Sequence, residues 1–148
     1  MATQTPSIQS FVPAQLLRWL ADRPMHDEPA SRTQEMAVLF ADLSDFSSLT
    51  LDITERQRAG PEKVTELLDS TFSTIVETIG RYGGEVLGFA GDSVLATWTL
   101  GESLAKSDAV ALASSCGLEV QGLTLPAAER PLRLRIGIGV GPGVLVRV

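Results

Sequence analysis

The chain has 148 residues, of which 44% are hydrophobic and 20% charged, and this composition suits one globular domain with a buried core. The formal net charge of −6 argues against a nucleic-acid-binding surface, because such surfaces are strongly basic. The single cysteine excludes a disulfide within the chain, and the single histidine excludes a zinc site built from several histidines.

The N-terminal segment and the hydropathy pattern favour a cytoplasmic protein with no membrane partner. Residues 1–10 lack the basic start and the apolar core of a signal peptide. No apolar run approaches the ~18 residues that a membrane-spanning helix needs. The absence of a possible disulfide also fits a reducing compartment.

The first predicted elements are a short helix and a polar segment. Residues 11–21 place leucines at helical spacing after Pro13, which suits the first turn of a helix. Residues 22–34 are polar and contain Pro24 and Pro29, and we interpret them as a linker. We therefore divide the chain into an N-terminal extension, residues 1–34, and a domain, residues 35–148.

A strand, a helix and a hairpin are predicted next. Residues 37–41 are continuously apolar, as in a central strand. After Pro61, apolar side chains recur at helical spacing over residues 64–79, and Gly83-Gly84 follows just past the end of this helix. Residues 85–89 and 93–99 have the character of two short strands, joined by a tight turn at residues 90–92.

The C-terminal part is predicted to hold a second helix and two strands. The helix covers residues 104–120, where Cys116 is interpreted as a small buried apolar residue. Residues 132–140 alternate as in a strand, with Arg133 and Arg135 on its solvated face. Residues 141–143 are predicted to turn the chain into a further strand from residue 144. This order of elements predicts an α/β (α+β) domain with the ferredoxin-like split βαβ fold.

Two aspartates draw attention within this arrangement. Asp42 follows the apolar run, and Asp92 lies in the hairpin turn. The first strand and the hairpin are neighbours in this fold, so the two side chains are expected at one edge of the sheet. Two carboxylates brought together repel unless a divalent cation lies between them. The spacing alone leaves two interpretations open, a Mg²⁺ site that handles phosphates and aspartates that cap turns.

Three segments resemble the class III nucleotidyl (adenylyl/guanylyl) cyclase catalytic domain. These segments are residues 38–46, with Phe40-Ala-Asp42-Leu-Ser-Asp-Phe46, residues 80–98, with Phe89-Ala-Gly-Asp92, and residues 132–143. The chain is most similar to the metal-binding first domain of the bicarbonate-responsive soluble adenylyl cyclases. The resemblance covers residues 11–148.

The resemblance implies an activity and a set of site residues. The family converts ATP to 3′,5′-cyclic AMP and pyrophosphate by two-metal phosphoryl transfer at a dimer interface. Two aspartates of the family, matching Asp42 and Asp92, hold two Mg²⁺ (or Mn²⁺) ions, and the carbonyl of Leu43 would add a ligand. The amides that would face phosphate oxygens are those of Ser44, Asp45 and Phe46. The implied partners are ATP and a second cyclase domain, from the same parent chain or from a second copy.

Three departures from the family pattern qualify this implication. Asp45 stands where the family has glycine, and Gly88 stands where many cyclases carry a lysine. The family's domain continues beyond the position of Val148, so we expect an incomplete C-terminus and an inactive fragment. A catalytically inactive cyclase-like regulatory or dimerisation module therefore stays open as an alternative. Another palm-like enzyme with paired acids is a third interpretation, and the choice between ATP and GTP also stays open.

Overall fold

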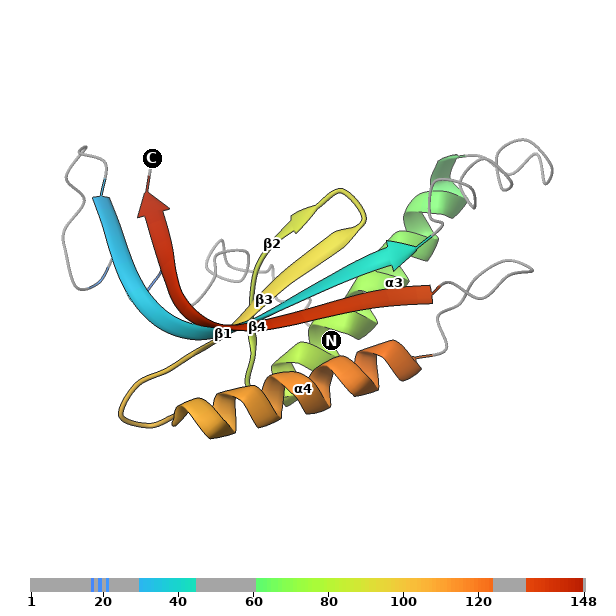
Figure 1. The fold of residues 1–148 in the computed structure, drawn as a ribbon. Coiled ribbons are helices and arrows are strands. Elements are labelled where there is room, and N and C mark those ends of the chain that lie inside the picture. Colours follow the sequence, from blue (N-terminus) through green and yellow to red (C-terminus); the bar gives the residue numbers. More distant parts are fainter. Residues whose placement is uncertain are drawn as a thin grey trace, which may run out of the picture.

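A four-stranded antiparallel sheet and two helices form the described part of the molecule. The computed structural model describes residues 30–44, 61–123 and 133–147, together with Leu17, Trp19 and Ala21. Along the chain the elements are β1 (Ala30–Ser44), α3 (Pro61–Arg81), β2 (Glu85–Ala90), β3 (Ser93–Thr99), α4 (Lys106–Gly122) and β4 (Arg133–Arg147) (Figure 1). The strand order β2-β3-β1-β4 is that of the predicted ferredoxin-like split βαβ fold.

The hydrophobic core lies between the sheet and the two helices. Alternate residues of β1 point into it, and they are at most 2% exposed: Ala37, Leu39, Ala41 and Leu43. The helices contribute buried residues to the same cluster: Ile75 and Ile79 from α3, and Ala109, Ala113, Cys116 and Val120 from α4. Both helices therefore cover one face of the sheet, while Asp42, being out of phase with these β1 residues, belongs to the other face.

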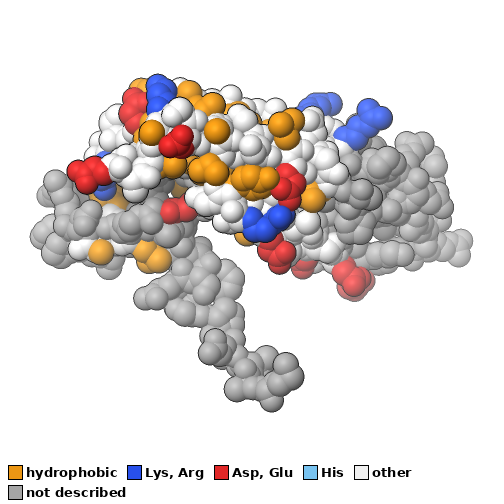
Figure 2. Space-filling view, turned by 90° about the horizontal axis from the view of Figure 1, so that it is seen from below, with side chains coloured by type: hydrophobic (Ala, Val, Ile, Leu, Met, Phe, Trp, Pro, Cys, Tyr) orange, Lys and Arg blue, Asp and Glu red, His pale blue; other side chains and the backbone are white. Residues whose placement is uncertain are grey.

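Helix α4 packs closely on the sheet because residue 117 is a glycine. A Cβ at Gly117 would lie 3.0 Å from side-chain carbons of Ile136 and Ile138, two residues of β4. Seen from below, the side on which α4 lies in Figure 1, apolar side chains gather along the middle of the visible surface with acidic and basic groups around them (Figure 2). No helix of the described ranges is long and apolar enough to cross a membrane.

A glycine pair ends α3, as the sequence predicts. Gly83 has a positive φ of 72°, and its N–H donates to the carbonyl of Gly80 over 2.9 Å. The N–H of Gly84 donates to the carbonyl of Ile79 over 3.0 Å. These two bonds form the Schellman motif, which satisfies the last carbonyls of a helix. The chain is thereby turned directly into β2.

Trp98 of β3 holds the end of α3 against the sheet. Its side chain is 1% exposed, and its Nε1–H donates to the carbonyl of Tyr82 over 2.8 Å. A Cβ at Gly84 would lie 2.6 Å from the ring atom Cζ2 of Trp98. The tryptophan is therefore a core residue, and it connects the end of α3 to the strand that follows Asp92.

Strands β1 and β4 are longer than the sequence predicts. Residues 30–34, which we interpreted as part of a linker, begin β1 and pair with residues 143–147. The turn expected at residues 141–143 does not form, and β4 continues through Pro142, which lies opposite Glu35. β4 is an edge strand, where a proline without an N–H is tolerated. In Figure 1 the two strands curve together away from the helices.

The remaining predicted elements agree with the structure where it describes them. α3, the β2–β3 hairpin and α4 lie within a few residues of their predicted bounds. The helix predicted over residues 11–21 falls mostly outside the described residues, although Leu17, Trp19 and Ala21 are helical.

Candidate functional site

The structure brings Asp42 and Asp92 together at one end of the sheet. β1 and β3 are antiparallel, and their register places Asp42 opposite Ser93, the residue that follows Asp92. The N–H of Leu43 donates to the carbonyl of Asp92 over 3.2 Å, which extends the pairing by one step into the hairpin turn. This end of the sheet, with the tip of β1 and the turn between β2 and β3, lies at the right in Figure 1.

A tight turn positions Asp92. Ala90 and Ser93 form the last pair of the β2–β3 hairpin, so that only Gly91 and Asp92 lie between the strands. Gly91 has a positive φ of 62°, a conformation that glycine adopts without steric cost. The sequence prediction of this turn is confirmed, and the turn leaves Asp92 half-buried.

Ser93 is a site residue that the sequence analysis missed. Its hydroxyl donates a hydrogen bond of 2.6 Å to Oδ1 of Asp42, and its side chain is 5% exposed. Asp42 itself is half-buried. The only sequence signal is the serine directly after Asp92, and it becomes informative only when the register of β1 and β3 is known.

Arg135 lies on the other side of Asp42. β4 pairs with β1 so that Arg135 is opposite Asp42, and residues paired in this way point to the same face of the sheet. Arg135 is exposed, as expected for a solvated strand face. The sequence did not show that this solvated face carries Asp42 as well. A row of Ser93, Asp42 and Arg135 therefore crosses three strands, with one hydrogen-bond donor and one cation beside the carboxylate.

The predicted phosphate loop is described only in its first part. Leu43 is 2% exposed, and its N–H donates to the Asp92 carbonyl. Ser44 is 7% exposed, and its hydroxyl oxygen has no hydrogen-bond partner among the residues that the structure describes. A buried hydroxyl without a partner loses free energy relative to water, so it is available to a ligand. Asp45 and Phe46 lie outside the described residues.

The chemistry of this donor set fits a hard divalent cation. Two carboxylates at adjacent backbone positions, together with the main-chain carbonyls beside them, are the oxygen ligands that Mg²⁺ prefers. Within the described ranges no three His, Cys, Asp or Glu side chains gather as a complete metal cage. Such a site suits an ion that shares its coordination with substrate phosphates, because Mg²⁺ is usually held by one or two carboxylates plus phosphate oxygens.

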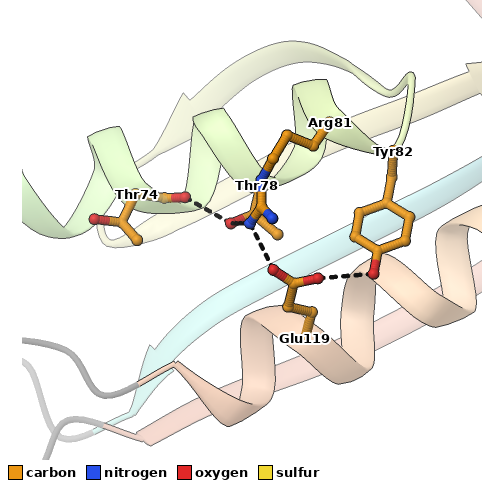
Figure 3. A network of polar contacts seen from close by, with 5 residues as sticks. All are labelled: Thr74, Thr78, Arg81, Tyr82 and Glu119. Atoms are coloured by element: carbon orange, nitrogen blue, oxygen red, sulfur yellow. Dashed lines mark hydrogen bonds and ion pairs between the residues drawn. The ribbon is translucent and has the colours of Figure 1, made fainter.

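A second polar cluster joins α3 to α4 (Figure 3). The carboxylate of Glu119 accepts hydrogen bonds from Tyr82 Oη over 2.7 Å and from Arg81 over 2.5 Å. These bonds lower the pKa of Glu119, and the same bond to Glu119 raises the pKa of Tyr82. Arg81 also donates to Thr78 over 3.0 Å. The cluster is a clamp between the two helices on the side of the sheet away from Asp42.

Cys116 is buried in α4, as the sequence analysis interpreted it. Its side chain is 0% exposed, and burial raises the pKa of its thiol to about 11. A thiol with such a pKa is protonated at neutral pH and is a poor nucleophile. It has no role in the candidate site.

Comparison with known proteins assigns the family. Residues 28–148 match the family described as the adenylate and guanylate cyclase catalytic domain. The chain belongs to this family. This cyclase domain is 31% identical to mouse (Mus musculus) adenylate cyclase type 10 over 120 residues, which cover 79% of the chain and 7% of the mouse protein. The chain thus spans a small fraction of that relative's length.

Solved structures of cyclases share the fold of this cyclase domain. The adenylyl cyclase CyaB from P. aeruginosa superposes with a TM-score of 0.61 at 21% identity, over 78% of this chain and 60% of that one. A dimeric guanylyl cyclase domain of the RhoGC fusion protein from Blastocladiella emersonii gives a TM-score of 0.61 at 16% identity, over 79% of this chain and 63% of that one. At these identities the likeness concerns the fold. Family membership argues against the third interpretation, a palm-like enzyme of another kind.

Proposed function

We propose that this cyclase domain supplies the metal-binding half of an adenylate cyclase site, with ATP as its substrate and 3′,5′-cyclic AMP and pyrophosphate as products. The observation that carries the proposal is the adjacency of Asp42 and Asp92, set by strand register and by the hydrogen bond from Leu43 to the Asp92 carbonyl. The relatives of known type, adenylate cyclase type 10 of mouse and human among them, favour ATP over GTP.

The residues of the chain have distinct tasks in this proposal. Asp42 and Asp92 are the carboxylate ligands of two divalent cations, and the carbonyl of Leu43 adds a ligand. These cations, when bound, neutralise charge on the triphosphate and on the departing pyrophosphate. The buried hydroxyl of Ser44 and the amides of residues 44–46 face phosphate oxygens. Arg135, opposite Asp42, adds positive charge on the same face.

A second cyclase domain completes the site in this proposal. Gly88 lies on the same face of the sheet as Asp42, and a Cβ built there meets no atom within 4 Å. Packing therefore does not require glycine at this position. Because glycine has no side chain that could contact a purine, recognition of the base falls to a partner domain in this proposal. This same feature supports the alternative, a regulatory module that dimerises without turning over nucleotide.

A metal titration tests the proposal on the chain itself. We expect Mn²⁺ to bind in the presence of ATP, as followed by electron paramagnetic resonance, and Asp42→Asn or Asp92→Asn to weaken binding by at least tenfold, because each removes a charged ligand. Glu102→Gln is the matched control: it removes one exposed carboxylate beyond the opposite end of β3. Equal affinities for all four proteins would contradict the proposal.

An activity assay then separates the two functional candidates. Cyclic AMP and pyrophosphate are measured with the chain alone and with an added cyclase domain that supplies the complementary half. We expect product only in the mixture, and its loss with Asp92→Asn. Metal binding without product in any mixture, with ATP or GTP, would favour the regulatory module.

A further inference from the structure

The hydrogen bond between Ser93 and Asp42 has the geometry of a charge-assisted contact. The Ser93 Oγ to Asp42 Oδ1 distance is 2.6 Å, within the ~2.5–2.7 Å typical of a hydroxyl that donates to a carboxylate. Ser93 is 5% exposed, so water competes little for this bond. Both residues belong to paired positions of regular strands, which fixes the distance between their backbones.

This bond determines how the Asp42 carboxylate can act. A serine hydroxyl has one hydrogen to donate, and here it is directed at Oδ1. The contact restrains rotation of the carboxylate about the Cβ–Cγ bond, and it leaves Oδ2 without that partner. Oδ2 is therefore the oxygen of Asp42 that this bond leaves to accept from, or coordinate to, a ligand.

Ser93 also connects the two acids of the site. Its backbone directly follows Asp92, whose carbonyl accepts from the N–H of Leu43, the residue after Asp42. The side chain of Asp42 is therefore bonded to Ser93 of β3, and the main chain of Asp92 is bonded to Leu43 of β1. The relative position of the two carboxylates depends on both bonds.

We propose that Ser93 is a positioning residue for metal binding, which holds the Asp42 carboxylate so that Oδ2 is presented to a divalent cation shared with Asp92. This inference rests on the proposed function, because it assumes that Asp42 is a metal ligand. Residues that hydrogen-bond to metal ligands orient them, and their loss commonly costs about 10- to 100-fold in metal affinity. Ser93 makes no contact with substrate in this role.

The structure offers a matched control on the same strand. Thr97 lies on the same face of β3 as Ser93 and is 1% exposed, and within the described part of the chain its hydroxyl oxygen has no hydrogen-bond partner. Thr97→Val thus removes a buried hydroxyl from β3 without removing a bond to Asp42. Ser93→Ala removes a buried hydroxyl together with that bond. The difference between the two variants reports on the bond itself.

The experiment titrates Mn²⁺ into the chain with ATP present, for the unaltered protein, Ser93→Ala, Thr97→Val and Ser93→Cys. We expect affinity to fall about 10- to 100-fold in Ser93→Ala and to stay within about twofold in Thr97→Val. Ser93→Cys keeps a similar size with a weaker donor, so its affinity should be intermediate. Circular dichroism verifies folding, and Ser93→Cys against Thr97→Val decides the question if Ser93→Ala does not fold.

The outcomes separate this inference from the proposed function. Tight metal binding by the unaltered chain, with equal affinities for the Ser93 variants and Thr97→Val, would overturn the role of Ser93 and leave the metal site standing. Absence of metal binding by the unaltered chain would overturn both. A loss confined to the Ser93 variants supports the positioning role.

Discussion

Three glycines at the end of α3 are expected to respond in opposite ways to the same substitution by alanine. Gly84 faces Trp98, and a Cβ there would lie 2.6 Å from Cζ2 and 2.8 Å from Cε2 of the indole. The ring cannot easily move away, because it is 1% exposed and its Nε1–H is bonded to the Tyr82 carbonyl. Overpacking of this kind costs about 1–3 kcal/mol, so Gly84→Ala should lower the free energy of unfolding by that amount.

The two neighbouring glycines separate this packing effect from backbone effects. Gly83 has a φ of 72° and open space around its Cβ position, so Gly83→Ala should cost about 1–2 kcal/mol through backbone strain alone. Gly80 lies within α3, also with open space around it, and Gly80→Ala should stabilise the protein by roughly 0.5–1 kcal/mol. The three changes add the same methyl group within five residues of chain.

Urea denaturation followed by circular dichroism measures these differences. We expect the midpoint to rise for Gly80→Ala and to fall for Gly83→Ala and Gly84→Ala, with an unchanged slope in each case. In a domain of this size, 1 kcal/mol corresponds to roughly 2–4 °C in melting temperature, which offers a second measurement. A Gly84→Ala protein as stable as Gly80→Ala would refute the close approach of Gly84 to the buried indole.

Two further predictions concern α4. Hydrogen bonds from Tyr82 and Arg81 lower the pKa of Glu119 below its ordinary value of 4.5. The ionised Glu119 side chain therefore stabilises the folded protein above pH 4.5, and this contribution is lost as the pH falls through the lowered pKa. The melting temperature of Glu119→Gln should therefore lie below that of the unaltered protein at pH 7, and this difference should disappear on acidification. A difference in melting temperature that does not change with pH would contradict the stabilising role of the ionised carboxylate. Cys116, with a thiol pKa of about 11, should react with an alkylating reagent at pH 8 much more slowly in the native protein than in urea, and equal rates would contradict its burial.

Local patterns in the sequence were sufficient to predict most of the elements. The apolar spacing along α3, the glycine pair that ends it and the turn at Gly91 each act over a few residues, and each element formed as predicted. The family resemblance, carried by the segments around Asp42 and Asp92, is confirmed by the family match to residues 28–148. Short-range signals of this kind depend little on the rest of the fold.

The extents of β1 and β4 depended on a partner far away in the chain. Residues 30–34 are mostly polar and carry no strand pattern of their own, and Pro142 with its flanking glycines has the composition of a turn. Each becomes a strand because the other provides hydrogen-bonding groups along its full length. A sequence pattern shows where a strand is possible, but the register between distant strands decides where it ends.

The same dependence on register explains why the neighbours of Asp42 were missed. β1 is a central strand, so Asp42 has one cross-strand neighbour on β3 and another on β4, and these are Ser93 and Arg135. Ser93 is 51 positions away in sequence, and nothing in its local segment points to Asp42. Knowledge of the antiparallel register over residues 36–42 and 93–99 would have been enough to find it.

The arrangement around Asp42 also bears on the choice between an active site and a regulatory module. Asp42 and Asp92 are both half-buried, and their backbones are neighbours, joined by the hydrogen bond from the Leu43 N–H to the Asp92 carbonyl. Ser93 hydrogen-bonds to Oδ1 of Asp42 and leaves the other carboxylate oxygen without that partner, so that this oxygen can coordinate a metal. A module that only dimerises gains nothing from holding two acids in this way. This geometry suits a site that binds a divalent cation, and we therefore favour the catalytic interpretation.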